Sequence, residues 1–172
     1  MTTPQAHQLE ILAKLKALNI VPASTEASEV ADDDALLQLI RHHISPSSRL
    51  KLYDEEIGTD NDAGEDYVAL MKRFSRISGG HLVYENASAT TEGDDDSGYQ
   101  VKIDFTWNAK PYAWAFGHDS DSISEDFLDA VIAHSRECPA GEFIDLMADD
   151  AMMIAFVPRD LAALLHQHEL VY

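Results

Sequence analysis

The chain has 172 residues, and 45% of them are hydrophobic, so length and composition predict one folded domain over residues 1–172 rather than a disordered segment. Its 31 Asp and Glu residues outnumber its 12 Lys and Arg residues, which gives a formal net charge of −19. Charge of this sign repels phosphate groups. We therefore expect no nucleic acid and no membrane as partner, and the charge favours a protein partner with a basic surface.

The N-terminal segment, MTTPQAHQLEILAKLKALNI, lacks the continuous apolar core and the small-residue cleavage site of a secretory signal. No stretch approaches the ~20 apolar residues that a membrane-spanning helix needs. The single cysteine, Cys138, has no second cysteine with which to form an internal disulfide. These features predict a soluble cytoplasmic protein.

Helical spacing of apolar residues dominates residues 1–78. It predicts an amphipathic helix over residues 5–18, and a second over residues 31–44 that begins with three aspartates and ends before the SPSS segment. A third helix is predicted around an apolar stripe and ends at Ser78–Gly80. The residues of that stripe are Tyr67, Leu70, Met71, Phe74 and Ile77.

Residues 79–172 are predicted to be rich in strands, with two further helices. Alternating apolar positions predict strands in residues 81–90, 99–107 and 111–116, and then in residues 142–147 and 152–157 with a turn between them. Capped helical patterns predict helices over residues 122–138 and 158–168. The sum is an α+β fold with an antiparallel sheet of about four or five strands and helices packed on it.

The aromatic side chains of the central strands alternate as core residues do. Val101, Ile103, Phe105 and Trp107 share one predicted face, which favours burial of Phe105 and Trp107. The next strand places Trp114 on a face that packs in the core or contacts another protein. Stacking on nucleobases is not expected, because such platforms lie in basic grooves.

Acidic residues concentrate in three segments that contain no Lys or Arg: residues 54–66, 92–96 and 119–129. The second lies in Thr90–Gly98, which is predicted to be a long surface loop between the first two strands. Solvated polar loops explain any one of these segments. Their recurrence favours a surface that contacts a basic partner.

No motif for a metal, a cofactor or a nucleophile is present. Windows that start at Asp60 or Asp94 fail the EF-hand pattern, because Glu65 and Tyr99 take the place of its glycine. The eight histidines lack metal-ligand spacing, and Cys138 lies at a predicted helix C-terminus, which does not stabilise a thiolate. No Gly-x-Ser-x-Gly elbow or glycine-rich phosphate loop occurs. We predict no enzymatic activity and no cofactor.

The order of elements carries a resemblance. A helix ending in LKALNIVP is followed by YDEEIGTDNDAGEDYVALMKRFSRISGGHL, YQVKIDFTWNAKPYAWAF and DSDSISEDFLDAVIAHS, and then by a closing hairpin and helix. This order resembles small acidic immunity proteins of bacterial polymorphic toxin systems, such as contact-dependent or type VI secretion systems. The resemblance implies a protein that binds a cognate toxin and occludes its active or substrate-binding site. It carries over no contact residues, because such families vary most at their binding surfaces.

Two alternatives remain: an acidic adaptor or DNA mimic that binds a protein, and an enzyme without a recognised signature. On the toxin-binding hypothesis, the contact residues come from the acidic segments and the exposed aromatic strand. They are Asp54, Glu55, Glu56, Asp60, Asp62, Glu92, Asp94, Asp95, Asp96, Trp114, Asp119 and Asp121. The sequence predicts neither the toxin's activity nor the oligomeric state.

Overall fold

Helices and antiparallel strands alternate along the chain in a computed structural model, which describes residues 3–53, 57, 62–119, 122–148 and 151–172. The helices are α1 (Ala6–Ala17), α2 (Asp33–His43), α3 (Ala63–Ile77), α4 (Glu125–Ser135) and α5 (Arg159–Gln167), with short 3-10 turns at Ala27–Val30 and Pro46–Ser48. The strands are β1 (Arg49–Leu52), β2 (Glu85–Asp94), β3 (Gly98–Trp107), β4 (Lys110–His118), β5 (Gly141–Asp145) and β6 (Met152–Pro158). The α+β class predicted from the sequence is confirmed.

The strands form two sheets instead of the one sheet of four or five strands that was predicted. Within the described ranges, the first sheet has the order β1-β6-β5 and the second has the order β2-β3-β4, and every pairing is antiparallel. The number of strands was underestimated because β1 was not recognised. Its four residues are too few to show a period, and their partner β6 lies about a hundred residues later in the chain.

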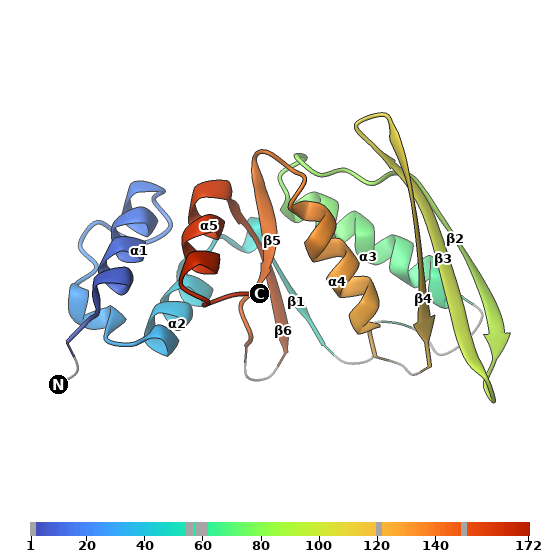
Figure 1. The fold of residues 1–172 in the computed structure, drawn as a ribbon, viewed down its shortest axis with the longest axis horizontal. Coiled ribbons are helices and arrows are strands. Elements are labelled where there is room, and N and C mark those ends of the chain that lie inside the picture. The colour runs from blue at the N-terminus through green and yellow to red at the C-terminus, as the bar shows by residue number, and fades with distance from the viewer. Residues whose placement is uncertain (1–2, 54–56, 58–61, 120–121, 149–150) are drawn as a thin grey trace.

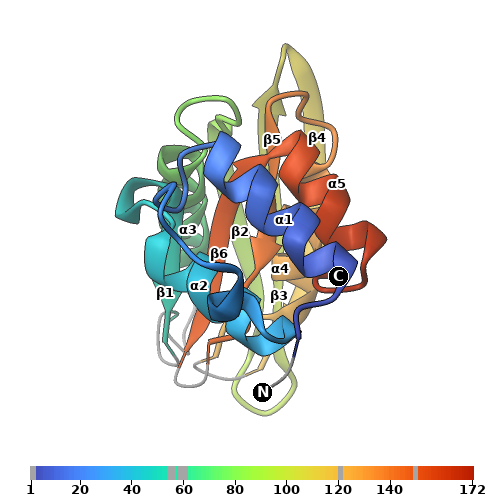
Figure 2. The same ribbon diagram turned by 90° about the vertical axis from the view of Figure 1, so that its left-hand side faces the viewer.

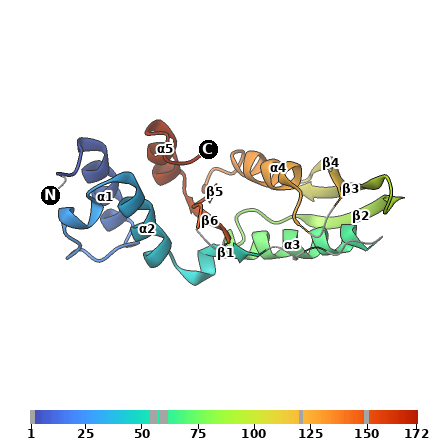
Figure 3. The ribbon, with the colours of Figure 1, turned by 90° about the horizontal axis from the view of Figure 1, so that it is seen from below.

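The layers follow one another along the long axis of the molecule. Figure 1 shows α1, α2 and α5 on one side of the first sheet, and α3 and α4 between that sheet and the second sheet. Figure 2 shows the same three outer helices in front of the first sheet. In Figure 3, seen from below, the second sheet again lies at the end of the molecule opposite α1. The first sheet is therefore covered on both faces, and the second on one.

Each face of the first sheet belongs to a different hydrophobic core. Ile144, Ala155 and Val157 pack with the outer helices, whereas Leu52, Phe143 and Ile154 pack with α3, α4 and the second sheet. The Phe74 ring on α3 lies 5.2 Å from that of Phe143, and the Tyr67 ring lies 4.7 Å from that of Phe116 on β4. The helices α3 and α4 thus join the two sheets. The prediction of a single domain over residues 1–172 stays a prediction.

The helices form where the apolar spacing predicted them. The Asp32 side chain accepts a hydrogen bond from the Ala35 amide at 2.8 Å, which satisfies an otherwise unpaired donor at the start of α2. The apolar stripe predicted for the third helix is buried along α3. However, α3 begins at Ala63 and not near Tyr67, so its first turn takes in Glu65 and Asp66 from the acidic segment. Carboxylates in that turn complement the helix dipole.

The central hairpin confirms the predicted alternation. Val101, Ile103, Phe105 and Trp107 are buried, with at most 7% exposure, while Gln100, Lys102 and Asp104 face solvent. On β4 the predicted face is also correct: Phe116 is buried, and Tyr112 and Trp114 are half-buried. Residues 79–90 fit less well, because β2 begins at Glu85 and not at His81.

The long surface loop predicted over Thr90–Gly98 is wrong. Strand β2 continues to Asp94 and β3 begins at Gly98, so only three residues form the turn. Acidic side chains hid the strand from sequence analysis, but Thr90 and Thr91 are β-branched and pair with Lys102 and Val101 across the ladder. Gly98 has a φ of 76°, a conformation that favours glycine and allows the chain to reverse here.

Candidate functional site

Three acidic segments that are distant in sequence meet at one end of the second sheet. The Gly64 amide in the first turn of α3 donates to the Thr91 hydroxyl on β2 at 3.0 Å. Tyr99, just after the β2–β3 turn, pairs with His118 at the end of β4. Figure 1 shows the start of α3, the β2–β3 turn, the end of β4 and the start of α4 at this end, which we call the acidic end. Its described acidic residues are Asp62, Glu65, Asp66, Glu92, Asp94, Asp95, Asp96, Asp119, Glu125 and Asp126.

A buried tyrosine links the elements at this end. The Tyr67 hydroxyl on α3 accepts a hydrogen bond from the Ser124 amide at the start of α4 and lies 2.9 Å from the His118 Nδ1. Burial raises the pKa of Tyr67 to about 12, although the bond from Ser124 opposes the rise, so the phenol stays protonated at neutral pH. Three elements are thereby held in a fixed relation beneath the acidic surface.

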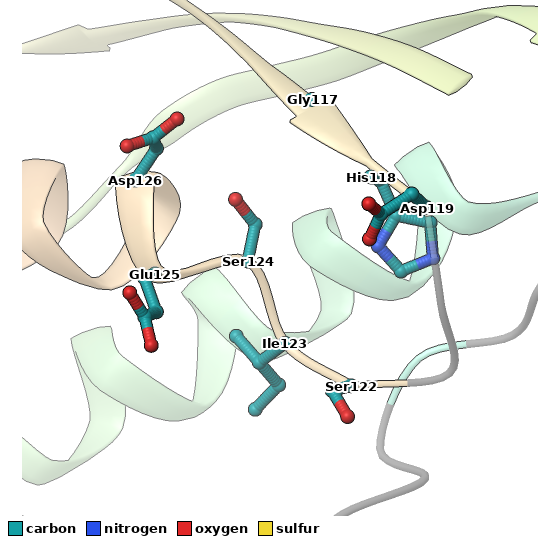
Figure 4. Close-up of a pocket in the computed structure, with 8 residues that line it drawn as sticks. All are labelled: Gly117, His118, Asp119, Ser122, Ile123, Ser124, Glu125 and Asp126. Atoms are coloured by element: carbon teal, nitrogen blue, oxygen red, sulfur yellow. The ribbon is translucent and has the colours of Figure 1, made fainter. Parts of the chain in front are cut away.

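A hollow of about 370 Å³ lies between the end of β4 and the start of α4. Figure 4 shows the Ser124 hydroxyl and the Asp119 carboxylate directed toward the same space, while Glu125 and Asp126 project from opposite sides of the first turn of α4. The described residues that line the hollow include no Lys or Arg. They are Gly117, His118, Asp119, Ser122, Ile123, Ser124, Glu125 and Asp126. Carboxylates and hydroxyls in this setting suit an ammonium or guanidinium group.

The β2–β3 turn is held by its own acidic side chains. The Asp94 carboxylate accepts hydrogen bonds from the Asp96 amide, the Ser97 amide and the Ser97 hydroxyl, at 2.6 to 3.1 Å. The bond from the Ser97 side chain is the largest cause that lowers the pKa of Asp94. The Tyr99 hydroxyl donates to Asp95 at 2.8 Å. Asp94 and Asp95 therefore shape the turn as well as charging it.

The structure brings together half of the predicted contact residues. Asp62, Glu92, Asp94, Asp95, Asp96 and Asp119 are exposed at the acidic end. Asp54, Glu55, Glu56, Asp60 and Asp121 lie outside the described residues. Trp114 is not at this end: it lies midway along β4, in an aromatic cluster. Glu125 and Asp126 belong to the acidic end but were not selected from the sequence, because first-turn carboxylates are ordinary features of helices.

The aromatic cluster surrounds a histidine that sequence analysis did not single out. His134 on α4 is 6% exposed, and neither ring nitrogen has a hydrogen-bond partner among the described residues. Its ring contacts those of Tyr84, Phe105, Trp107, Tyr112 and Trp114, at centroid distances of 4.5 to 5.8 Å. Burial lowers the pKa of His134 below its ordinary 6.5, with Glu137 opposing and Lys110 adding to the shift.

We expect His134 to make folding weaker in acid. A lowered folded-state pKa means that the unfolded chain binds the proton first, so the contribution to stability is complete above about pH 6.5 and is lost as pH falls toward the folded value. Replacing His134 with Phe should remove this component. Urea titrations give the free energy of unfolding of the variant minus that of the parent. This difference should be more favourable to the variant at pH 5 than at pH 8. Equal differences at the two pH values would contradict the assignment.

A buried ionic cluster is the second feature that the sequence did not reveal. The Glu142 carboxylate, 3% exposed on β5, accepts one hydrogen bond from Arg159 at 2.7 Å and lies against the His166 ring. The His166 side chain is partly buried and contacts this carboxylate. The cluster lies between β5 and α5, in the first sheet, so it is separate from the acidic end.

Comparisons with known proteins do not assign the chain to a group: no family model, no curated protein and no solved structure matches it. Among the described residues, no group of three or more His, Cys, Asp or Glu side chains is placed to hold a metal ion. The same part of the chain contains no helix with the length and apolar character needed to cross a membrane.

Proposed function

We propose that this chain is an immunity protein that acts in the cytoplasm, binds a cognate toxin with a basic surface and occludes the toxin's active or substrate-binding site. The observation that carries the proposal is the meeting of three acidic segments at one end of the second sheet, around a hollow without a basic residue among its described lining. The order of elements, which resembles immunity proteins, supports the same proposal.

Complementary charge would act first on the rate of encounter. Opposite fields steer two proteins together, with association rates of up to ~10⁸ to 10⁹ per molar per second at low salt. The Tyr67 hydrogen bonds fix the start of α4 against β4, so the carboxylates are already in place before the partner arrives. Preorganisation of this kind lowers the entropy lost on binding. A lysine or arginine of the toxin would then enter the hollow.

The proposal predicts a salt-dependent loss of association rate when the acidic end is neutralised. The test variant combines Glu92→Gln, Asp96→Asn and Asp119→Asn, which are exposed and leave the Asp94 and Asp95 bonds of the turn intact. Association with a candidate toxin, chosen from the products of the neighbouring genes, should slow by about tenfold at low ionic strength. The deficit should shrink at 0.15 M salt, where the screening length is ~8 Å. Surface plasmon resonance measures the association rate, and survival of toxin-expressing cells measures protection.

A matched control removes three charges elsewhere, by Asp34→Asn, Glu85→Gln and Glu169→Gln. These residues are exposed and lie outside the acidic end. The control should associate and protect nearly as the parent does. The proposed function fails if both triple variants associate at the same rate at every salt concentration, or if the parent protects cells from no candidate toxin.

A further inference from the structure

Strand β4 forms an open edge of the second sheet. It pairs with β3 over nine consecutive positions, from Trp107 with Lys110 to Tyr99 with His118, without a shift of register. In the described part of the chain, no other strand pairs with β4, and the backbone groups of residues 110–117 make no hydrogen bond to other backbone groups outside that ladder. Helix α4 packs below the inner face of the strand, where Phe127 contacts Trp114 and Phe116, and leaves the edge itself unpaired.

The turn geometry determines which backbone groups point away from the sheet. Asn108 and Ala109 have φ values of 50° and 60°, and positive values at both positions define a type I′ two-residue hairpin. The flanking pair Trp107 and Lys110 is then hydrogen-bonded, and the pairs alternate along an antiparallel ladder. The amides and carbonyls directed away from β3 belong to alternate residues. These residues are Pro111, Ala113, Ala115 and Gly117.

The residue types agree with this assignment. Pro111 lacks an amide hydrogen, and proline is tolerated in a strand where that hydrogen would point off an edge. The four outward residues are exposed, and none has a side chain large enough to shield the backbone. The opposite edge differs: the register of β2 shifts between Glu85 and Ser88, where Asn86 has a φ of 54°. Bulges of this kind prevent strand pairing, and β4 has none.

We propose that an extended segment of the basic partner adds to β4 as a fourth strand of the second sheet. The proposal rests on the proposed function, because it names how that partner is held. Unpaired amides of Ala113, Ala115 and Gly117 would donate to the segment, and the carbonyls of the same three residues and of Pro111 would accept from it.

Charge selects this occupant over a second copy of the chain. The C-terminal end of β4 leads into Asp119 and faces the start of α4, with Glu125 and Asp126. A segment along β4 can place a basic side chain there, whereas a second copy would bring another charge of −19 to the same edge. Alternate side chains of the segment would meet the half-buried rings of Tyr112 and Trp114. Trp114 would then contact the partner although it lies outside the acidic end.

A synthetic peptide serves as the probe: about ten residues, the length of a long strand, with Arg alternating with Val or Thr. Its control carries an N-methyl group on every amide, so neither edge of the control peptide can pair with β4. Amide hydrogen exchange by NMR should show Ala113, Ala115 and Gly117 exchanging rapidly in the free protein and at least about tenfold more slowly with peptide. Amides of Tyr112, Trp114 and Phe116, which face β3, should be protected in both states.

A pair of substitutions tests the same edge. Ala115→Pro removes one outward amide hydrogen and places a ring in the path of the added strand, while Ala115→Ser keeps the amide. Peptide affinity should fall by at least about tenfold for Ala115→Pro and stay within about twofold of the parent for Ala115→Ser. Exchange in the parent protein gives an independent result if the proline variant does not fold.

Several outcomes overturn the inference. They are absence of peptide binding, no added protection of the three amides at saturating peptide, equal affinity of the methylated peptide, and equal affinity of the two Ala115 variants. Protection that rises with protein concentration alone, together with a dimer mass, would assign the edge to a second copy.

If neutralising the acidic end slows toxin binding but Ala115→Pro does not weaken it, the inference fails and the proposed function stands. If Ala115→Pro weakens peptide binding but no toxin is neutralised, the proposed function fails instead.

Discussion

Replacing Trp107 with alanine is expected to lower the free energy of unfolding by about 3 to 5 kcal/mol, because a large buried aromatic side chain is removed and a cavity remains. Trp107 is 7% exposed at the end of β3, and its ring contacts those of Tyr112 and His134. Total stability of a domain is only ~5 to 15 kcal/mol, so the loss approaches the limit of folding. The melting temperature should fall by roughly 6 to 20 °C.

A matched substitution on the opposite face provides the control. Asp104 lies three residues earlier on β3 and is exposed, so Asp104→Ala should change stability by no more than about 0.5 kcal/mol. Urea denaturation of the parent and both variants measures the difference. If Trp107→Ala unfolds at the urea concentration of Asp104→Ala, the Trp107 side chain does not contribute to the core.

Local elements were predictable because burial repeats with the period of the backbone. Alternation along β3 placed Trp107 inward, and spacing of three and four residues placed Tyr67 and Phe74 on one face of α3. The division into two sheets was not predictable by this means. An apolar pattern shows that a strand has a buried face but does not identify the strand that pairs with it, and β1 joins β6 across most of the chain.

The candidate site was predictable in composition and not in geometry. Charge without neighbouring Lys or Arg identified the three acidic segments, but their meeting depends on long-range contacts such as that of Gly64 with Thr91. A periodic pattern predicts burial only for apolar residues, so polar residues are assigned to the exposed face. His134 and Glu142, which are buried, therefore gave no signal. The open edge of β4 depends on both the register of the hairpin and the absence of a fourth strand in the described residues.

Replacing Arg159 with methionine is expected to destabilise the protein by about 3 to 5 kcal/mol, since it leaves the buried Glu142 carboxylate without its cation. The guanidinium contributes more than charge. It donates to Glu142 at 2.7 Å, to the Arg136 carbonyl at 2.8 Å and to the Cys138 carbonyl, and so joins the end of α4 to β5 and α5. Methionine keeps the apolar stem of the side chain and removes these bonds. Urea denaturation at neutral pH measures the loss.

A double variant separates two effects of Arg159→Met: the unpaired charge left on Glu142, and the loss of the hydrogen bonds to backbone carbonyls. Glu142→Leu removes the buried carboxylate, so adding it to Arg159→Met should recover part of the stability, with a coupling of about 1 to 3 kcal/mol between the two sites. Lys14→Met gives the matched comparison, because Lys14 pairs with Asp160 at 2.8 Å in an exposed setting and should show a much smaller effect. Strict additivity of the two changes would contradict the role of the buried pair.

Since Glu142, Arg159 and His166 lie in the first sheet and α5, a loss of stability there should leave the association rate of the folded fraction with the toxin unchanged. That separation between stability and association would assign the buried charges to folding and the exposed acidic end to binding.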